Sequence, residues 1–116
     1  MIVEVKLAAA LICFSGGCHP VLVGKDTPVG RYDLARRIVL SEGYGGDVLM
    51  FSEDARGILA IHRVWKGRPK ERRERRISSA RAVDRRGVTA GCINVTPEVY
   101  DALTDCCSTG TLVIVD

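Results

Sequence analysis

Short apolar segments recur along the chain, separated by glycine, proline and polar residues that favour turns. Alternating or continuous apolar positions over these segments predict β-strands. In chain order the predicted strands are 2–5, 10–14, 21–23, 31–40, 48–51, 57–62 and 111–115. In the longest of them, Tyr32, Leu34, Ile38 and Leu40 would share one buried face. The pattern predicts a mainly β protein with one or two short helices.

The clearest helix signal follows Thr96. Thr96 is a good N-cap residue, and Pro97 is favoured at the first helical position. Glu98 would lie near the positive end of the helix dipole. We expect Val99, Leu103 and Cys106 or Cys107 to face the core, and Ser108, Thr109 and Gly110 to end the helix.

Residues 63–86 differ from the rest of the chain. They hold eleven Lys and Arg against three Asp and Glu, whereas the whole chain has a net charge of +3. Such a block favours either a lid or anion-binding flap, or a solvated surface loop. Nucleic-acid binding is a third interpretation, but only Trp65 supplies a base-stacking ring among the charges, so it is not expected.

Composition limits the remaining possibilities. An apolar fraction of 47% in 116 residues fits one globular domain, residues 1–116, and not a disordered chain. No apolar run approaches the ~20 residues that cross a bilayer. The short run 7–14, followed by Cys18, resembles a secretion signal with a lipid-attachment cysteine, although residues 2–14 also predict two strands. We find no convincing signal peptide.

The number of cysteines is odd. Five cysteines leave at least one unpaired within the chain, and a free Cys92 would satisfy that count. Cys106 and Cys107 are adjacent and are not expected to pair with each other, and we leave the disulfide pattern open. There is no CxxC motif, so no structural zinc site is expected.

The candidate chemistry centres on Cys92. It follows Gly91, whose missing Cβ allows a sharp turn and a close approach by substrate. His62 ends the buried segment 57–62 and is the candidate base, whereas His19 is interpreted as incidental. A cysteine on a turn beside a histidine is an arrangement for acyl transfer through a thioester.

Four segments in order resemble the L,D-transpeptidase catalytic domain, also called the YkuD-like domain. They are GKDTPVGRY at 24–32, ILAIH at 58–62, TAGCIN at 89–94 and TGTLVIV at 109–115. The chain departs from the family in having Ala90 two residues before the cysteine, Arg63 after the histidine and a separation of 30 positions from His62 to Cys92.

The resemblance implies a compact L,D-transpeptidase-like β-sandwich or mixed sheet carrying a basic insertion, and a reaction on peptidoglycan stem peptides. Cys92 would attack the carbonyl of the third stem residue and expel the terminal D-alanine. His62 would hold and pass on the proton, the Arg63 backbone carbonyl would orient the imidazole, and the N–H groups of Gly91 and Cys92 would bind the oxyanion.

For substrate contact the candidates are Thr89, Asn94, Tyr44 and Trp65, with Tyr44 in a glycine-rich loop at 41–47 that we predict to be mobile. No metal or cofactor is expected. The implied substrate places the protein outside the cytoplasm, in the periplasm or cell wall, by an export route that the sequence does not define. Neither the acceptor nor the oligomeric state follows from the sequence.

Two alternatives from other classes stay open. One is a different Cys/His peptidase or amidase on the same scaffold. The other is a non-catalytic basic module that binds an anionic polymer through residues 63–86. A Cys92 thiol that ionises well below the ordinary thiol pKa would favour an enzyme.

Overall fold

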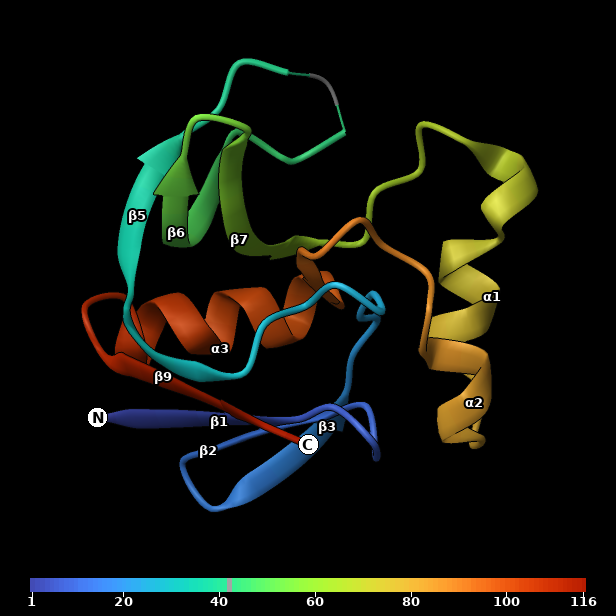
Figure 1. The fold of residues 1–116 in the computed structure, drawn as a ribbon, viewed down its shortest axis with the longest axis horizontal. Helices are drawn as coiled ribbons and strands as arrows, with labels where there is room; N and C mark the ends of the chain where they lie inside the picture. Colours follow the sequence, from blue (N-terminus) through green and yellow to red (C-terminus); the bar gives the residue numbers. More distant parts are fainter. Residues whose placement is uncertain (42) are drawn as a thin grey trace.

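The computed structural model describes residues 1–41 and 43–116, and its strands form two sheets (Figure 1). The first sheet has the order β3-β2-β1-β9-β4 and contains β1 (Ile2–Lys6), β2 (Leu11–Phe14), β3 (Gly17–Pro20), β4 (Gly30–Asp33) and β9 (Thr111–Val115). The second has the order β5-β6-β7-β8 and contains β5 (Ala35–Ile38), β6 (Asp47–Asp54), β7 (Gly57–Arg63) and β8 (Ile93–Val95). The expectation of a mainly β fold is confirmed.

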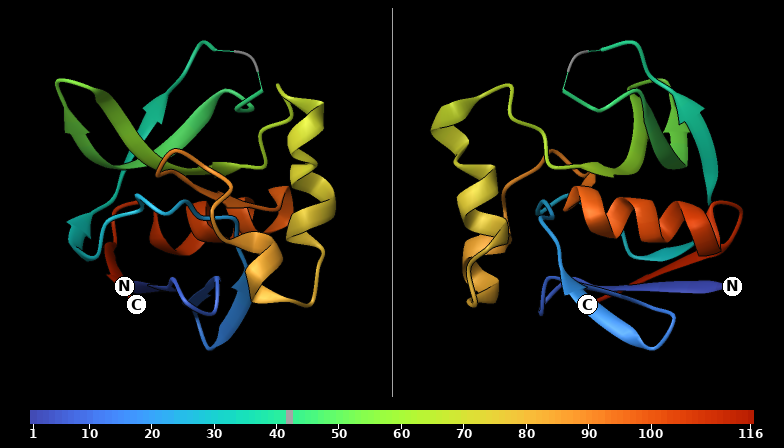
Figure 2. Two further views of the ribbon diagram at one scale, coloured as in Figure 1. Left: turned by 45° about the vertical axis from the view of Figure 1, so that its right-hand side comes forward. Right: turned by 180° about the vertical axis from the view of Figure 1, so that it is seen from behind.

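Helix α3 (Pro97–Cys107) lies between the two sheets in every view (Figures 1 and 2). Its fully buried Tyr100 and Leu103 join the inward-facing residues of both sheets in one core. The predicted N-cap is present, because the Thr96 hydroxyl accepts a hydrogen bond from the Val99 N–H at 3.3 Å. The core face differs by one position: Tyr100 is buried, whereas Val99 is only partly buried.

The predicted strand 31–40 is wrong. The chain changes sheets inside it, with β4 pairing with β9 and β5 pairing with β6, and the buried Leu34 lies at the crossing. Beyond that point the alternation no longer marks a buried face, since Ile38 is 71% exposed and Leu40 is 96% exposed. One sequence pattern spans two strands because the buried side of the chain changes at Leu34.

The N-terminal region contains the two strands predicted for 2–14, but the next strand is displaced. Residues 17–20 form β3, paired with β2, whereas Val21, Leu22 and Val23 are buried outside it. Leu22 exchanges backbone hydrogen bonds of 3.0 and 2.9 Å with Asn94. This short antiparallel bridge covers the outer edge of β8.

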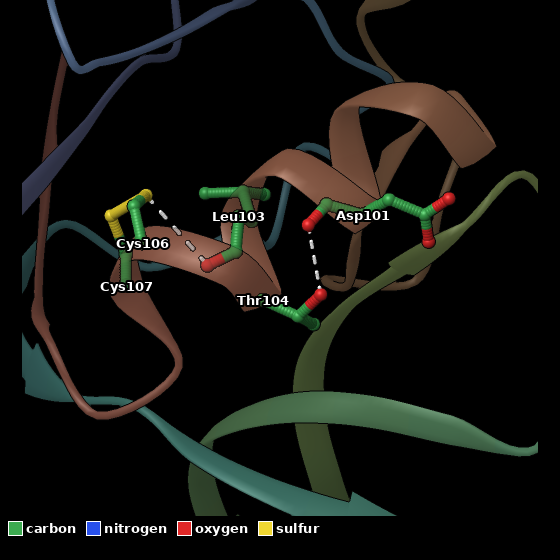
Figure 3. The surroundings of a disulfide bond; sticks show 5 residues. All are labelled: Asp101, Leu103, Thr104, Cys106 and Cys107. Carbon is green, nitrogen blue, oxygen red and sulfur yellow. Dashed lines mark hydrogen bonds between the residues drawn. A yellow bond between two sulfur atoms is a disulfide. The ribbon is translucent and has the colours of Figure 1, made fainter.

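Four cysteines form two disulfides. Cys13 and Cys18 are directly opposite each other in the β2–β3 hairpin and are bonded. Cys106 and Cys107 are also bonded, so the expectation that adjacent cysteines would not pair is wrong (Figure 3). They occupy the last turn of α3, where carbonyl groups no longer bind a following turn and the backbone is less constrained. Cys92 is the free cysteine.

The basic segment 63–86 is folded and is not an extended loop. It contains the 3₁₀ helix η1 (Pro69–Glu71) and the short helices α1 (Arg73–Ile77) and α2 (Ala82–Arg85), which stand together beside the two sheets (Figure 2). Arg85 is buried and donates to the carbonyls of Ala9 and Ala10 at 3.0 and 3.3 Å. These bonds fix the segment to the β1–β2 connection.

Within the described residues, no helix has both the length and the apolar character needed to cross a membrane. The predicted loop 41–47 includes residue 42, which lies outside the described residues.

Candidate active site

The two strands that carry the candidate base and nucleophile are neighbours. β7 and β8 pair in parallel, with His62 opposite Asn94, so Cys92, which directly precedes β8, lies beside Ala60 of β7. His62 and Cys92 line one cavity of about 860 Å3. Thr89, Tyr44 and Trp65 line it as well. The structure therefore brings five residues singled out in the sequence to one cavity.

The turn that presents Cys92 is held by two threonines. Thr89 Oγ1 donates to the Cys92 carbonyl at 2.6 Å and accepts from the Gly91 N–H at 3.1 Å. Thr27 Oγ1, which accepts from the Gly24 N–H, donates to the Gly91 carbonyl at 3.0 Å. The TP motif at 27–28 thus fixes the nucleophile turn, a role that its turn chemistry alone did not indicate.

Gly91 has a φ of +136°, and a Cβ there would lie 2.9 Å from the Leu59 side chain. Glycine is therefore required by the turn, as expected. The expected role of its N–H in binding an oxyanion is not supported, because that N–H already donates to Thr89 Oγ1. The Cys92 N–H remains the candidate donor.

The His62 ring is held in one tautomer. Its Nδ1 lies 2.7 Å from the Arg63 carbonyl oxygen, which can only accept, so Nδ1 carries the proton and Nε2 is an acceptor. Burial lowers the pKa of His62 to about 4; the bond to Arg63 opposes this shift and the charge of Arg73 adds to it. At neutral pH the imidazole is uncharged, and Nε2 carries a lone pair that faces Asn94 Nδ2 at 3.3 Å.

The Cys92 thiol lacks the lowered pKa that would have favoured an enzyme. Burial raises the pKa of Cys92, and a backbone hydrogen bond with Ala60 and the charge of Arg73 only partly counter this. Without substrate, the site holds a neutral thiol and a neutral imidazole.

Asn94 does not face the cavity, contrary to the expectation that it contacts substrate. It is fully buried, because β8 lies between β7 and the Leu22 bridge. Its Oδ1 accepts from Arg73 Nη1 at 3.0 Å and from the Trp65 N–H at 3.3 Å, and its Nδ2 lies 3.3 Å from His62 Nε2. Asn94 therefore forms hydrogen bonds with residues around the cavity and does not line the cavity itself.

Aromatic rings cover the base. The Tyr44 ring meets the His62 ring edge to face, with 4.6 Å between centroids, and stacks on Trp65 at 6.4 Å. Arg63 holds this arrangement, since its Nη1 donates to the Tyr44 carbonyl and to Asp47 Oδ1, each at 3.0 Å. Asp47 is buried and also accepts from Arg36 and Tyr100. The Arg63 side chain thus has a role beyond that expected of its carbonyl.

Arg73 and Asp47 were missed by sequence reasoning. Arg73 is one of eleven basic residues in its segment, and no spacing distinguishes it from its neighbours. Asp47 follows two glycines at a predicted strand edge, where an acidic residue is ordinarily exposed. Among the described residues, no group of three or more His, Cys, Asp and Glu side chains lies close enough to hold a metal ion.

The chain matches no protein-family model and no curated protein sequence. Solved structures with the same fold include the L,D-transpeptidase of Xylanimonas cellulosilytica, with a TM-score of 0.61 at 15% identity over 98% of this chain. An L,D-transpeptidase from Mycobacterium smegmatis gives 0.61 at 19% identity over 99%. L,D-transpeptidase 1 of Mycobacterium tuberculosis gives 0.58 at 17% identity over 99%. The chain spans 59%, 58% and 58% of those three structures, respectively, and at these identities the likeness establishes the fold.

Proposed function

We propose that this chain is a cysteine acyltransferase acting on peptidoglycan stem peptides, as an L,D-transpeptidase or L,D-carboxypeptidase. The observation that carries the proposal is the pairing of a free Cys92 with a neutral His62 in one cavity, on a fold shared with solved L,D-transpeptidases. The orientation of His62 by a backbone carbonyl supports it, because Nε2 is then the nitrogen that can take a proton.

In the proposed reaction, the Cys92 sulfur attacks the carbonyl carbon of the third stem residue while His62 Nε2 takes the thiol proton. The bond to the terminal D-alanine then breaks, and His62 returns the proton to the leaving amine. An amine of a second stem, or water, attacks the resulting thioester and releases Cys92. The first outcome is a cross-link and the second is a trimmed stem.

The cavity suits a substrate with both signs of charge. Its lining residues include the acidic Asp26 and Asp54 and the basic Arg56, Arg68 and Arg73. A stem peptide carries a free side-chain amine and carboxylates. Thr89, Tyr44 and Trp65 would complete the contact surface.

We propose an extracytoplasmic location, in the periplasm or cell wall. The implied substrate lies there, and the two disulfides are typical of proteins that fold in oxidising compartments.

A carbapenem should acylate the protein at a single site. One of the similar structures is an L,D-transpeptidase in complex with imipenem. If Cys92 is the nucleophile, intact-mass spectra should show one adduct, located on the peptide that contains Cys92. Cys92→Ser is the control and should remain unmodified after the same exposure. Labelling of Cys92 by iodoacetamide without any carbapenem adduct would argue for a different Cys/His enzyme.

The basic segment has a groove of its own that favours anion binding as an accessory activity. A cavity of about 540 Å3 is lined by Trp65, Lys66, Arg68, Pro69, Arg72, Arg73, Glu74 and Arg75. Arg68, Arg72 and Arg75 are exposed there, whereas Arg76 donates to the carbonyls of Asp84 and Arg86 and is part of the fold. Anionic cell-wall polymers are the proposed ligand.

Replacing Arg68, Arg72 and Arg75 together by Gln should therefore weaken binding to purified sacculi and flatten its salt dependence. Interactions between exposed charges are screened beyond a Debye length of ~8 Å at physiological salt, so the wild-type pull-down should fall steeply as salt rises. The matched control replaces Arg31, Arg81 and Arg86 by Gln. This triple change removes the same amount of positive charge from exposed residues outside the groove. Equal losses in the two triple variants would mean that net charge, and not the groove, binds the polymer.

A further inference from the structure

Arg73 is a cation of the basic segment that lines both cavities and contacts Asn94. Only 11% of its side chain is exposed, and its Nε donates to Glu71 Oε1 at 2.9 Å. Its guanidinium carbon lies 5.1 Å from the centre of the Trp65 ring, a cation–π arrangement. Its Nη1 donates to Asn94 Oδ1 at 3.0 Å. Arg73 is therefore held in one position, between the cavity of the active site and the basic groove, and lines both.

Two donors orient the Asn94 amide, and Arg73 is the closer of them. Oδ1 accepts from Arg73 and, less closely, from the Trp65 N–H at 3.3 Å, so Nδ2 is the atom that faces His62. An amide N–H beside an imidazole nitrogen is favourable only if that nitrogen carries a lone pair. His62 Nε2 meets this condition because Nδ1 donates to the Arg63 carbonyl.

We propose that Arg73 is a positioning residue, which acts through Asn94 to keep His62 Nε2 unprotonated and aligned. The inference rests on the proposed role of His62 as the base. It also makes the segment between base and nucleophile part of the catalytic apparatus and not only an appendage that binds polymers.

Two effects of Arg73 act in the same direction. Its positive charge disfavours an imidazolium, and its hydrogen bond acts together with that of the Trp65 N–H to keep the amide from rotating. A rotated Asn94 would turn Oδ1 toward His62 and favour a proton on Nε2, so His62 could no longer accept the proton of Cys92. During the reaction Asn94 has to yield Nε2 to that proton.

Three other residues also lie close to His62. Tyr44 packs on the ring from the β5–β6 connection, and Cys92, which directly precedes β8, shares the cavity. Arg63 contributes its carbonyl, while its charge is directed to Asp47. Arg73 is thus the cation whose removal should change the titration of His62 most.

The test is an NMR titration of the imidazole signals in the wild type, Arg73→Gln, Arg73→Lys and the control Arg86→Gln. The chain has two histidines, so His19 serves as an internal reference. We expect Arg73→Gln to raise the pKa of His62, because a nearby like charge is removed. Arg73→Lys should give a smaller rise, and Arg86→Gln none, since Arg86 is exposed and lines neither cavity.

An unchanged His62 titration in both Arg73 variants, with His19 also unchanged, would overturn the proposal. Arg73→Lys, the milder change, allows this conclusion even if Arg73→Gln does not fold. The measurement needs no substrate. A raised His62 pKa in a protein without transpeptidase or carboxypeptidase activity would leave the role of Arg73 intact and refute the proposed function alone.

Discussion

Replacing Cys92 by Ala is expected to abolish turnover of defined muropeptides while leaving the fold intact. Loss of a nucleophile that acts together with a base typically costs a factor on the order of 10⁴ or more in rate. The side chain is only partly exposed but lies at the cavity and outside the core cluster, so its truncation should cost little stability. The measurement is mass spectrometry of muropeptide products beside a thermal melt.

The matched control removes a disulfide-bonded pair of cysteines that lies away from the cavity. Replacing Cys13 and Cys18 together by Ala deletes the hairpin disulfide but leaves the cavity unchanged. That variant should melt earlier and keep its chemistry, whereas Cys92→Ala should do the opposite. Wild-type turnover by Cys92→Ala would show that the nucleophile is wrongly assigned, and the non-catalytic alternative would then gain support.

Asp47→Ala should cause the largest loss of stability for a single polar side chain. Its side chain is 7% exposed and accepts from Arg36 at 2.7 Å, from Arg63 at 3.0 Å and from Tyr100 at 3.1 Å. Removing it leaves the Arg63 guanidinium and the Tyr100 hydroxyl without their carboxylate partner. Breaking a buried charge pair in this way typically costs about 3–5 kcal/mol of unfolding free energy.

The same carboxylate should make stability depend on pH. Burial raises the pKa of Asp47, but hydrogen bonds from Arg36, Arg63 and Tyr100 outweigh it and hold the pKa below its ordinary 3.8. The stabilisation is thus present above the pKa of the unfolded chain and is lost as pH falls through the lower folded value. Denaturant titrations of wild type and Asp47→Ala should converge in acid.

Glu53→Ala is the control for Asp47. Glu53 pairs with Arg37 at 3.1 Å, but both side chains are about half exposed, so the loss should be at most about 1 kcal/mol. Equal destabilisation by the two substitutions would mean that the buried network contributes no more than a surface ion pair.

The sequence predicted the features that depend on neighbouring residues. The apolar run that ends at His62, the Thr96–Pro97 helix start and the glycine before Cys92 are all local signals, and the structure contains each of them. They place the base and the free thiol, although no spacing in the sequence states that β7 and β8 are adjacent. The resemblance implied only that His62 acts on the Cys92 proton, and strand β8 itself was not predicted.

The features that were missed depend on contacts between distant segments. Asn94 looked like a substrate contact because its motif lies beside Cys92, but the Leu22 bridge and Arg73 enclose it. The strand predicted over 31–40 failed for the same reason, since the switch between sheets at Leu34 is decided by what packs on either side. Hydrophobic periodicity indicates how apolar and polar residues alternate along a segment, but it does not indicate which strand that segment pairs with.

The pairing of β1 with β9 has a consequence for how this chain acquires its structure. The two strands lie side by side in parallel near the middle of the first sheet, and Ile2 aligns with Thr111, almost the whole described chain away. Hairpins such as β2–β3 and β6–β7 can form from local contacts, but this pairing requires closure of a very long loop. We therefore expect slow folding, in which the hairpins form early and β9 docks last. During synthesis the exposed edge of β1 has no partner until the final strand emerges, and this interval is when the chain is most prone to aggregation.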